Sequence, residues 1–190
     1  MGIKRLLPTL LSGVTLSVGS RSAPLLYVSS SQINFQVPYE VSPGTVDVTV
    51  TTPGGTAKTT ATVTAVAPAI FTYGNNWAVV QNQDYTLNAA ANPARVGSYI
   101  TLYGTGGGAV APPVATANAA PVSTTSQTIA KISASINGVA AQVSFAGLTG
   151  GAVGLLQVTI QIPAVPSGNY AITLQSAGVT SNSPTIAVTQ

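Results

Sequence analysis

Side chains that carry acid–base, covalent or metal chemistry are nearly absent from this sequence. It contains no His and no Cys, which excludes Ser-His-Asp and Cys-His catalysis and the usual zinc sites. Its acids are Glu40, Asp47 and Asp84. Glycoside hydrolysis needs two carboxylates about 5–9.5 Å apart across a cleft, and calcium needs about six to eight oxygen ligands. Glu40 and Asp47 flank a predicted turn, where we expect solvated charges, so we predict neither an enzyme nor a metal site.

One glycine-rich stretch has the spacing of a dinucleotide-binding loop. Residues 104–109, GTGGGA, match that fingerprint and follow a predicted strand. The fingerprint also requires a helix, whose N-terminus binds the pyrophosphate, but the prolines in the next residues, VAPPVAT, exclude one. We interpret the stretch as a glycine-rich strand end and predict no cofactor.

Aromatic side chains are the remaining candidates for a binding surface. Tyr73, Trp77 and Tyr85 all fall within residues 67–97, and Trp77 is the only Trp of the chain. Their rings could stack on sugars, as in a carbohydrate-binding module. Trp and Tyr also bury large areas, so the same residues could fill a junction between structural units. We expect the second role, with a sugar-binding surface as the alternative.

The composition favours an uncharged polar surface. The hydrophobic fraction is 45%, enough for a core, but only 5% of residues are charged, against about 25% in an average soluble domain. Such a surface suits extracellular polymers and surface layers, or a small domain kept soluble by a larger parent protein. The six basic residues are scattered, so we predict no nucleic-acid partner. No apolar run reaches about 18 residues, so we predict no membrane span.

The first 23 residues imitate a secretory leader, but we expect them to belong to the fold. Lys4 and Arg5 precede a Leu-rich stretch. However, Pro8 interrupts that stretch, and Arg21 stands where a small residue is wanted before a cleavage after Ala23. Apolar residues also alternate with polar ones over residues 14–18, which is typical of a strand.

A strand-and-stop motif occurs twice, as QINFQVP at residues 32–38 and as QVTIQIP at residues 157–163. In each copy the apolar residues alternate with Gln, Asn or Thr, and the proline ends the strand because it has no N–H to donate. The apolar positions, expected to face a core, are Ile33, Phe35 and Val37 in the first copy and Val158, Ile160 and Ile162 in the second.

The repeat extends outward from this motif and predicts an all-β fold of two sandwich-like units. Val14, Leu16 and Val18 correspond to Ile132, Ala134 and Ile136; Ala23, Leu25 and Tyr27 to Ala141, Val143 and Phe145; Val46, Val48 and Val50 to Tyr170, Ile172 and Leu174. We expect strands at 13–18, 24–29, 31–37, 45–52, 57–65, 98–103, 129–136, 140–146, 155–162, 169–175 and 184–189. Between the units, residues 67–97 are expected to pack against both as a connector with short strands, burying Trp77.

The first copy of the repeat lacks a strand. The second unit opens with GSYITLYG at residues 97–104, whereas residues 1–13 show no alternation. A sandwich without that strand exposes core side chains and unpaired backbone groups, which form a template for another chain. We predict that a neighbouring subunit donates a strand from residues 1–11 or from the long loop 105–128. Its contact side chains would be Ile3, Leu6, Leu7, Leu10, Leu11, Val110 and Val114. The alternatives are that the connector fills the gap or that the chain is a piece of a longer one.

Several stretches resemble one family of proteins. They are LLPTLLSGVTLSVGSRSAPLLYVSSSQINFQVP, APAIFT, QNQDYTLNAAANPARVGSYITLYGTGGG and GLLQVTIQIP. They resemble an uncharacterised C-terminal domain of large secreted or surface proteins of acidobacteria. Each unit also resembles an IPT/TIG domain, an immunoglobulin-like β-sandwich. The resemblance implies an extracellular location and this fold, and it implies no catalytic residue.

We therefore predict an all-β chain of two tandem immunoglobulin-like units, at 1–66 and 97–190, joined by a packed connector at 67–96. The predicted function is a non-enzymatic extracellular structural protein. It would form a head-to-tail homopolymer, such as a bacterial surface filament or surface layer, held by intersubunit β-strand addition. The alternative is an adhesive module of a larger secreted protein that binds carbohydrate or protein.

Overall fold

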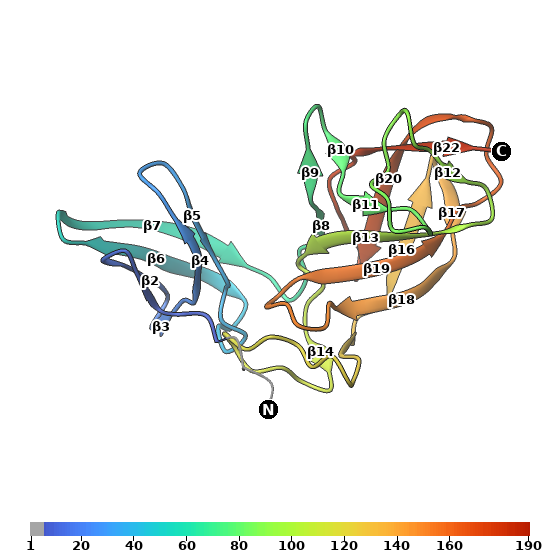
Figure 1. The fold of residues 1–190 in the computed structure, drawn as a ribbon. Coiled ribbons are helices and arrows are strands. Elements are labelled where there is room, and N and C mark those ends of the chain that lie inside the picture. The colour runs from blue at the N-terminus through green and yellow to red at the C-terminus, as the bar shows by residue number, and fades with distance from the viewer. Residues whose placement is uncertain (1–5) are drawn as a thin grey trace.

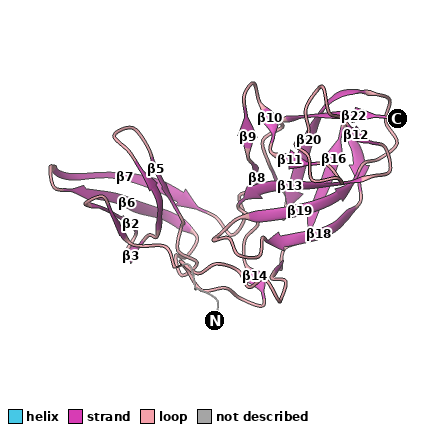
Figure 2. Cartoon of the chain, viewed as in Figure 1, coloured by secondary structure: helices cyan, strands magenta, loops and turns pink. Residues whose placement is uncertain are grey.

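The computed structural model describes residues 6–190, in which every regular element is a β-strand (Figures 1 and 2). The all-β prediction is therefore confirmed. No helix that could cross a membrane is present in these residues. The strands form two units that Figure 1 shows side by side, the first in blue and the second in green to red.

The first unit is a small sandwich. Its strands are β1 (Leu10–Leu11), β2 (Val14–Val18), β3 (Arg21–Ser22), β4 (Leu25–Val28), β5 (Ile33–Phe35), β6 (Gly44–Thr52) and β7 (Gly55–Val63). One sheet has the order β1-β2-β6-β7 with β3 beside β2, and the other is the β4-β5 hairpin alone. The core between them has four buried residues, Leu16, Val18, Ala23 and Leu25.

The second unit is larger. Its strands are β8 (Ala69–Ile70), β9 (Thr72–Tyr73), β10 (Trp77–Ala78), β11 (Val80–Gln81), β12 (Ala94–Arg95), β13 (Tyr99–Thr105), β14 (Val110–Ala111), β15 (Gln127–Thr128), β16 (Ile132–Ile136), β17 (Val139–Ala141), β18 (Val143–Leu148), β19 (Leu156–Gln161), β20 (Gly168–Ser176), β21 (Val179–Thr180) and β22 (Thr185–Thr189). One sheet has the order β17-β16-β20-β22-β10-β9, with β12 and β21 beside it; the other has the order β11-β13-β19-β18-β15-β14, with β8 beside it.

The internal repeat extends to the pairing register of the strands. The cross-strand pairs Leu16–Val50 and Val18–Val48 of the first unit correspond to Ala134–Leu174 and Ile136–Ile172 of the second. The pair Leu25–Phe35 of β4 and β5 likewise corresponds to the pair Val143–Ile160 of β18 and β19. In both strand pairs the register shifts within the two residues that follow, before Tyr27 and before Phe145. Strands β2 and β16 also share one pattern of burial along their five residues. Two copies of one β-unit are therefore present, as the sequence predicts.

The connector differs from its predicted place between the units, because its strands join the sheets of the second unit. β8 and β11 pair with β13, while β10 and β12 pair with β22. Two asparagine side chains strengthen this docking, since an amide offers one donor and one acceptor, like a strand neighbour. Asn88 bonds both the N–H and the C=O of Ala187, at 2.8 and 2.9 Å, and Asn182 does the same for Ile70, at 2.7 and 2.9 Å. The connector therefore does not fill the gap in the first unit.

The predicted alternation of residues 32–38 is wrong at its end. The strand stops at Phe35, which is half-buried; Gln36 is buried and Val37 is 44% exposed. The physical reason is a contact with the loop that follows β14. The Ala117 N–H donates to Oε1 of Gln36 over 2.8 Å, which draws that side chain inward. In the second unit Ile160 and Ile162 are both buried, as predicted.

Candidate functional site

The first unit has an uncovered sheet edge at β5. In the second unit, β19 lies between β18 and β13. Its equivalent, β5, has β4 on one side and, among residues 6–190, no strand on the other. β13 pairs with β19 through six residue pairs, including Ile100–Ile160 and Leu102–Val158. The positions equivalent to Ile160 and Val158 are Phe35 and Ile33, which have no such neighbour.

Backbone groups of β5 point toward this edge. The Gln36 N–H donates to the Pro24 carbonyl over 2.9 Å, on the side of β4, as the Gln161 N–H donates to Gln142 in the second unit. Neighbouring residues of a strand direct their N–H and C=O groups to opposite sides. The groups of Phe35 and Ile33 therefore face the uncovered side, and a strand lying there could pair with them.

Strand β7 is the second surface that lacks a cover. Eight of its nine residues are exposed, whereas the three central residues of its equivalent, β22, are buried. In the second unit, Ile186 and Val188 of β22 share one core with Ile100 and Leu102 of β13. By the pairing with β6, Ala57, Thr59 and Ala61 of β7 lie on the same face as the core valines. That inner face of β7 and the edge of β5 together form what we call the open slot.

The rim of the open slot is apolar and uncharged. Residues 24–39, which include β4 and β5, contain no ionisable side chain except Tyr27 and Tyr39. Large apolar side chains around the hairpin remain exposed: Leu26, Tyr27, Val37 and Tyr39. Exposed apolar groups on a hairpin with an unpaired edge are typical of a surface that binds a protein strand.

Most of the predicted donor residues have partners within their own chain, and their donation to another subunit stays a prediction. Leu10 and Leu11 form β1 and pair with β2, while Leu6 makes an isolated bridge to Asn118. The Leu7 N–H donates to the Ala117 carbonyl over 3.0 Å. Ile3 lies outside the described residues. In the loop, Val110 is buried with Ala120 and Leu148, and Val114 packs against them.

Part of the loop 105–128 joins the two units, and we call residues 116–118 the latch. Besides the contacts of Ala117, the Tyr39 N–H donates to Thr116 Oγ1 over 3.0 Å, and that hydroxyl donates to Glu40 over 2.8 Å. This hydrogen bond lowers the pKa of Glu40, and burial raises the pKa of Tyr39. The latch therefore holds the end of β5 but leaves its edge free.

The three acids lie apart and each has a local partner. Asp47 pairs with Lys58 at 2.9 Å on an exposed surface. Asp84 accepts hydrogen bonds from the N–H and hydroxyl of Thr86, which lower its pKa. Within residues 6–190, no group of three or more acidic, His or Cys side chains could hold a metal ion.

The glycine-rich stretch is a strand end that packs closely on β8 and on the residues just before it. Side chains at Gly104 and Gly106 would collide with the carbonyl oxygens of Ala69 and Ala67. The need for close backbone contact explains these glycines without a phosphate ligand.

The structure brings together two of the three predicted aromatic residues. Tyr73 and Trp77 lie directly opposite each other on the β9–β10 hairpin, and both are half-buried. Trp77 pairs with a strand of the second unit. The Tyr73 hydroxyl donates to the Asn88 carbonyl over 2.6 Å. Tyr85 is 82% exposed in a separate turn.

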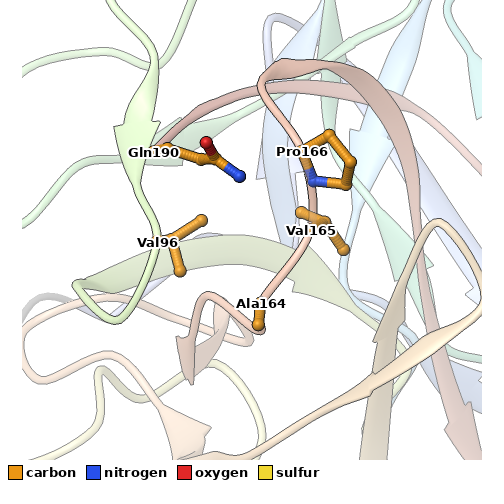
Figure 3. A pocket seen from close by; sticks show the side chains of 5 residues that line it. All are labelled: Val96, Ala164, Val165, Pro166 and Gln190. Atoms are coloured by element: carbon orange, nitrogen blue, oxygen red, sulfur yellow. The ribbon is translucent and has the colours of Figure 1, made fainter.

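One hollow on the second unit lacks chemistry of its own. Figure 3 shows its lining, which is Val96, Ala164, Val165, Pro166 and Gln190. None of these side chains is ionisable, and Gln190 supplies its one polar side chain. It offers shape but no acid, base or nucleophile.

Comparison with known proteins finds a family that is similar to the first unit. Residues 7–67 match the family of the IPT/TIG domain. The chain therefore contains an IPT/TIG-like domain. No match was found among curated proteins.

Two solved structures are similar to the chain over most of its length. One is Bacteroides ovatus SGBP-B of a mixed-linkage glucan utilization locus, in complex with a mixed-linkage heptasaccharide; it is 16% identical, with a TM-score of 0.37 and coverage of 92% of this chain. The chain spans 38% of that protein's length. The other is domains 4 and 5 of the S-layer protein SbsC, 16% identical, with a TM-score of 0.28, covering 94% of this chain and 78% of that one. At these TM-scores, neither likeness assigns a ligand or a partner.

Proposed function

We propose that the chain is a non-enzymatic structural protein of the bacterial cell surface, whose subunits assemble into a filament or surface layer by β-strand addition at the open slot. The observation that carries the proposal is the contrast between equivalent strands. β19 and β22 are covered in the second unit, whereas β5 and β7 are uncovered in the first. The polar, weakly charged surface and the resemblance to acidobacterial surface proteins support an extracellular location.

Energetics support strand addition at this place. Covering a large apolar side chain contributes about 1.5–3 kcal/mol, and Ile33, Phe35 and several rim residues are only partly covered. A strand that docks there also pairs the free backbone groups of β5. Such a contact joins different surfaces of successive subunits, so it generates a filament unless it closes into a ring. The partner is proposed to be another copy of the chain.

A charge in the open slot tests this proposal. Thr59 lies on the inner face of β7, opposite Val48, while Thr62 lies on the outer face, opposite Thr45, and both are exposed. Thr59→Lys places an ammonium group where the incoming strand would be buried, and Thr62→Lys adds the same charge outside. Sedimentation and negative-stain microscopy of the full chain should show polymers for the parent chain and for Thr62→Lys, and none for Thr59→Lys. A parent chain that stays monomeric, or equal polymers from both variants, would contradict the proposal.

A second candidate function is carbohydrate binding at Tyr73 and Trp77. The observation that favours it is their position opposite each other on one hairpin, with both rings partly exposed. Two adjacent rings could stack on sugar residues. Titration of bacterial and plant polysaccharides should then quench the fluorescence of Trp77, and Trp77→Ala should abolish binding. Unchanged fluorescence across the polysaccharides would leave this candidate without support.

A further inference from the structure

In the second unit, β13 covers the edge of β19, and the equivalent edge of β5 in the first unit is uncovered. The side chains of β13 therefore indicate what kind of strand would fit on β5. We infer that the open slot binds an uncharged strand of a neighbouring polypeptide with large aliphatic residues at alternate positions, paired antiparallel to β5 in the register that β13 adopts on β19. The inference rests on the proposed function, because it names the strand by which neighbouring chains would join. It commits to a sequence pattern and to a register.

The register follows from the pairs on the other side of the hairpin. Leu25 pairs with Phe35 as Val143 pairs with Ile160, so Phe35 and Ile160 are equivalent. Ile160 pairs with Ile100 across the edge that β13 covers. The incoming strand should therefore place its first inward aliphatic residue opposite Phe35. The second inward aliphatic residue of the incoming strand should lie opposite Ile33, because Ile33 is equivalent to Val158 and Val158 lies opposite Leu102.

The space to be filled and the lack of charged neighbours define which side chains the incoming strand should carry. Ile100 and Leu102 are at most 1% exposed in the second unit, where they fill the space against β22. In the open slot, Ala61 stands at the position of Ile186, so at least as much volume remains to be filled. Neither residues 24–39 nor residues 97–105 carry an acid or a base. An inward charge on the incoming strand would lose its hydration without gaining a partner.

Backbone orientation shows which amide groups of a β13-like strand make the contact. The N–H of Tyr103 donates to Val79, and its carbonyl accepts from Phe71, both away from β19. Leu102 is the residue next to Tyr103 in the strand, so its N–H and C=O groups point the other way and face β19. A methyl group on the amide nitrogen of Leu102 would block docking on β5, whereas one on Tyr103 would point to the outer side.

Peptides with the sequence of residues 97–105, GSYITLYGT, extended by two lysines for solubility, test the inference on the full chain. Fluorescence polarisation should detect saturable binding of the parent peptide. We expect methylation of the Leu102 amide to weaken binding about tenfold or more, and methylation of the Tyr103 amide to change it less than about twofold. The chain variant Thr59→Lys should lose binding, and Thr62→Lys should retain it. Equal binding of the two methylated peptides would overturn the inference.

Disulfide trapping tests the register, because the chain has no Cys of its own. The residue of the peptide that corresponds to Thr101 should lie opposite Asn34, as Thr101 lies opposite Thr159. Asn34→Cys in the chain should form a disulfide with a peptide carrying Cys at the Thr101 position about tenfold faster than with one carrying Cys at the Tyr103 position. Equal rates would refute the register.

The peptide and polymer experiments separate the two proposals. If the chain polymerises in a Thr59-dependent manner but no β13-like peptide binds or cross-links, the inferred strand pattern is wrong and assembly at the open slot stands. If the peptides bind in register but the parent chain never polymerises, the slot takes the inferred strand and the homopolymer is wrong.

Discussion

Replacing Phe35 with alanine should cost less stability than the same truncation at Ile160, although the two residues occupy equivalent positions. Ile160 is fully buried, and truncation of such a residue costs about 2–5 kcal/mol. Phe35 would cost about 3–5 kcal/mol if it were fully buried. It is only partly buried, with no strand beside it, so we expect a smaller cost of roughly 2–3 kcal/mol.

The two units offer separate signals for this measurement. Trp77 belongs to the second unit, while Tyr27 and Tyr39 belong to the first, and the two cores share no residue. Chemical unfolding followed by Trp fluorescence should therefore report the second unit, and near-ultraviolet circular dichroism should include the first. Phe35→Ala should shift the unfolding transition of the first unit and leave the Trp77 fluorescence transition unchanged. Ile160→Ala should shift the Trp77 fluorescence transition, which reports the second unit. A loss of 4 kcal/mol or more at Phe35, on the order of full burial, would refute the uncovered edge.

Three further outcomes are expected. Asn88→Leu should destabilise the second unit by about 2–4 kcal/mol in chemical unfolding, because it leaves the buried backbone of Ala187 without its pair; exposed Asn75→Leu should change it by less than about 0.5 kcal/mol. The lowered pKa of Glu40 means that its contact with Thr116 stabilises the fold above the ordinary carboxyl pKa and is lost as pH falls through the folded value. Glu40→Gln should thus remove part of the loss in melting temperature on going from pH 6 to pH 3. Fusing a second copy of residues 97–105 before residue 6 through a flexible Gly/Ser linker should raise the melting temperature of the first unit and abolish polymers; a fusion with Asn at both aliphatic positions should do neither.

The elements with regular alternation could be predicted from the sequence. Most predicted strands lie within two residues of the observed ones, because alternate burial in a sandwich leaves a direct trace in the order of side chains. One exception is the predicted strand at 140–146, which is divided between β17 and β18 in different sheets. Alternation alone does not show a change of sheet. It also does not show where a strand ends when a loop distant in sequence binds one residue, as Ala117 binds Gln36.

The place of the connector could not be predicted, because its contacts depend on side chains rather than on alternation. Strands of two residues leave no periodic pattern, and β8 to β12 are all of that length. The signal in the sequence is a set of asparagines, including Asn88, whose buried amide acts as a strand neighbour for Ala187. The gap in the first unit, by contrast, followed from counting strands in the repeat. The predicted donors remain a prediction, and Leu6 and Val110 have partners in their own chain.

The side chains of the open slot combine two opposite demands. A wholly apolar face beside an unpaired edge would promote aggregation of the free subunit. β7 meets this risk with Ala61 at the position of Ile186 and with Ala57 and Thr59 farther along its inner face, and it keeps a large side chain only at Val63, the position of Val188. β5 nevertheless retains Ile33 and Phe35 at the positions that would contact the proposed incoming strand. Water can thus wet the slot while it is empty, and an aliphatic strand can still displace that water. This division of residues between β7 and β5 is expected of a surface that is covered only on assembly.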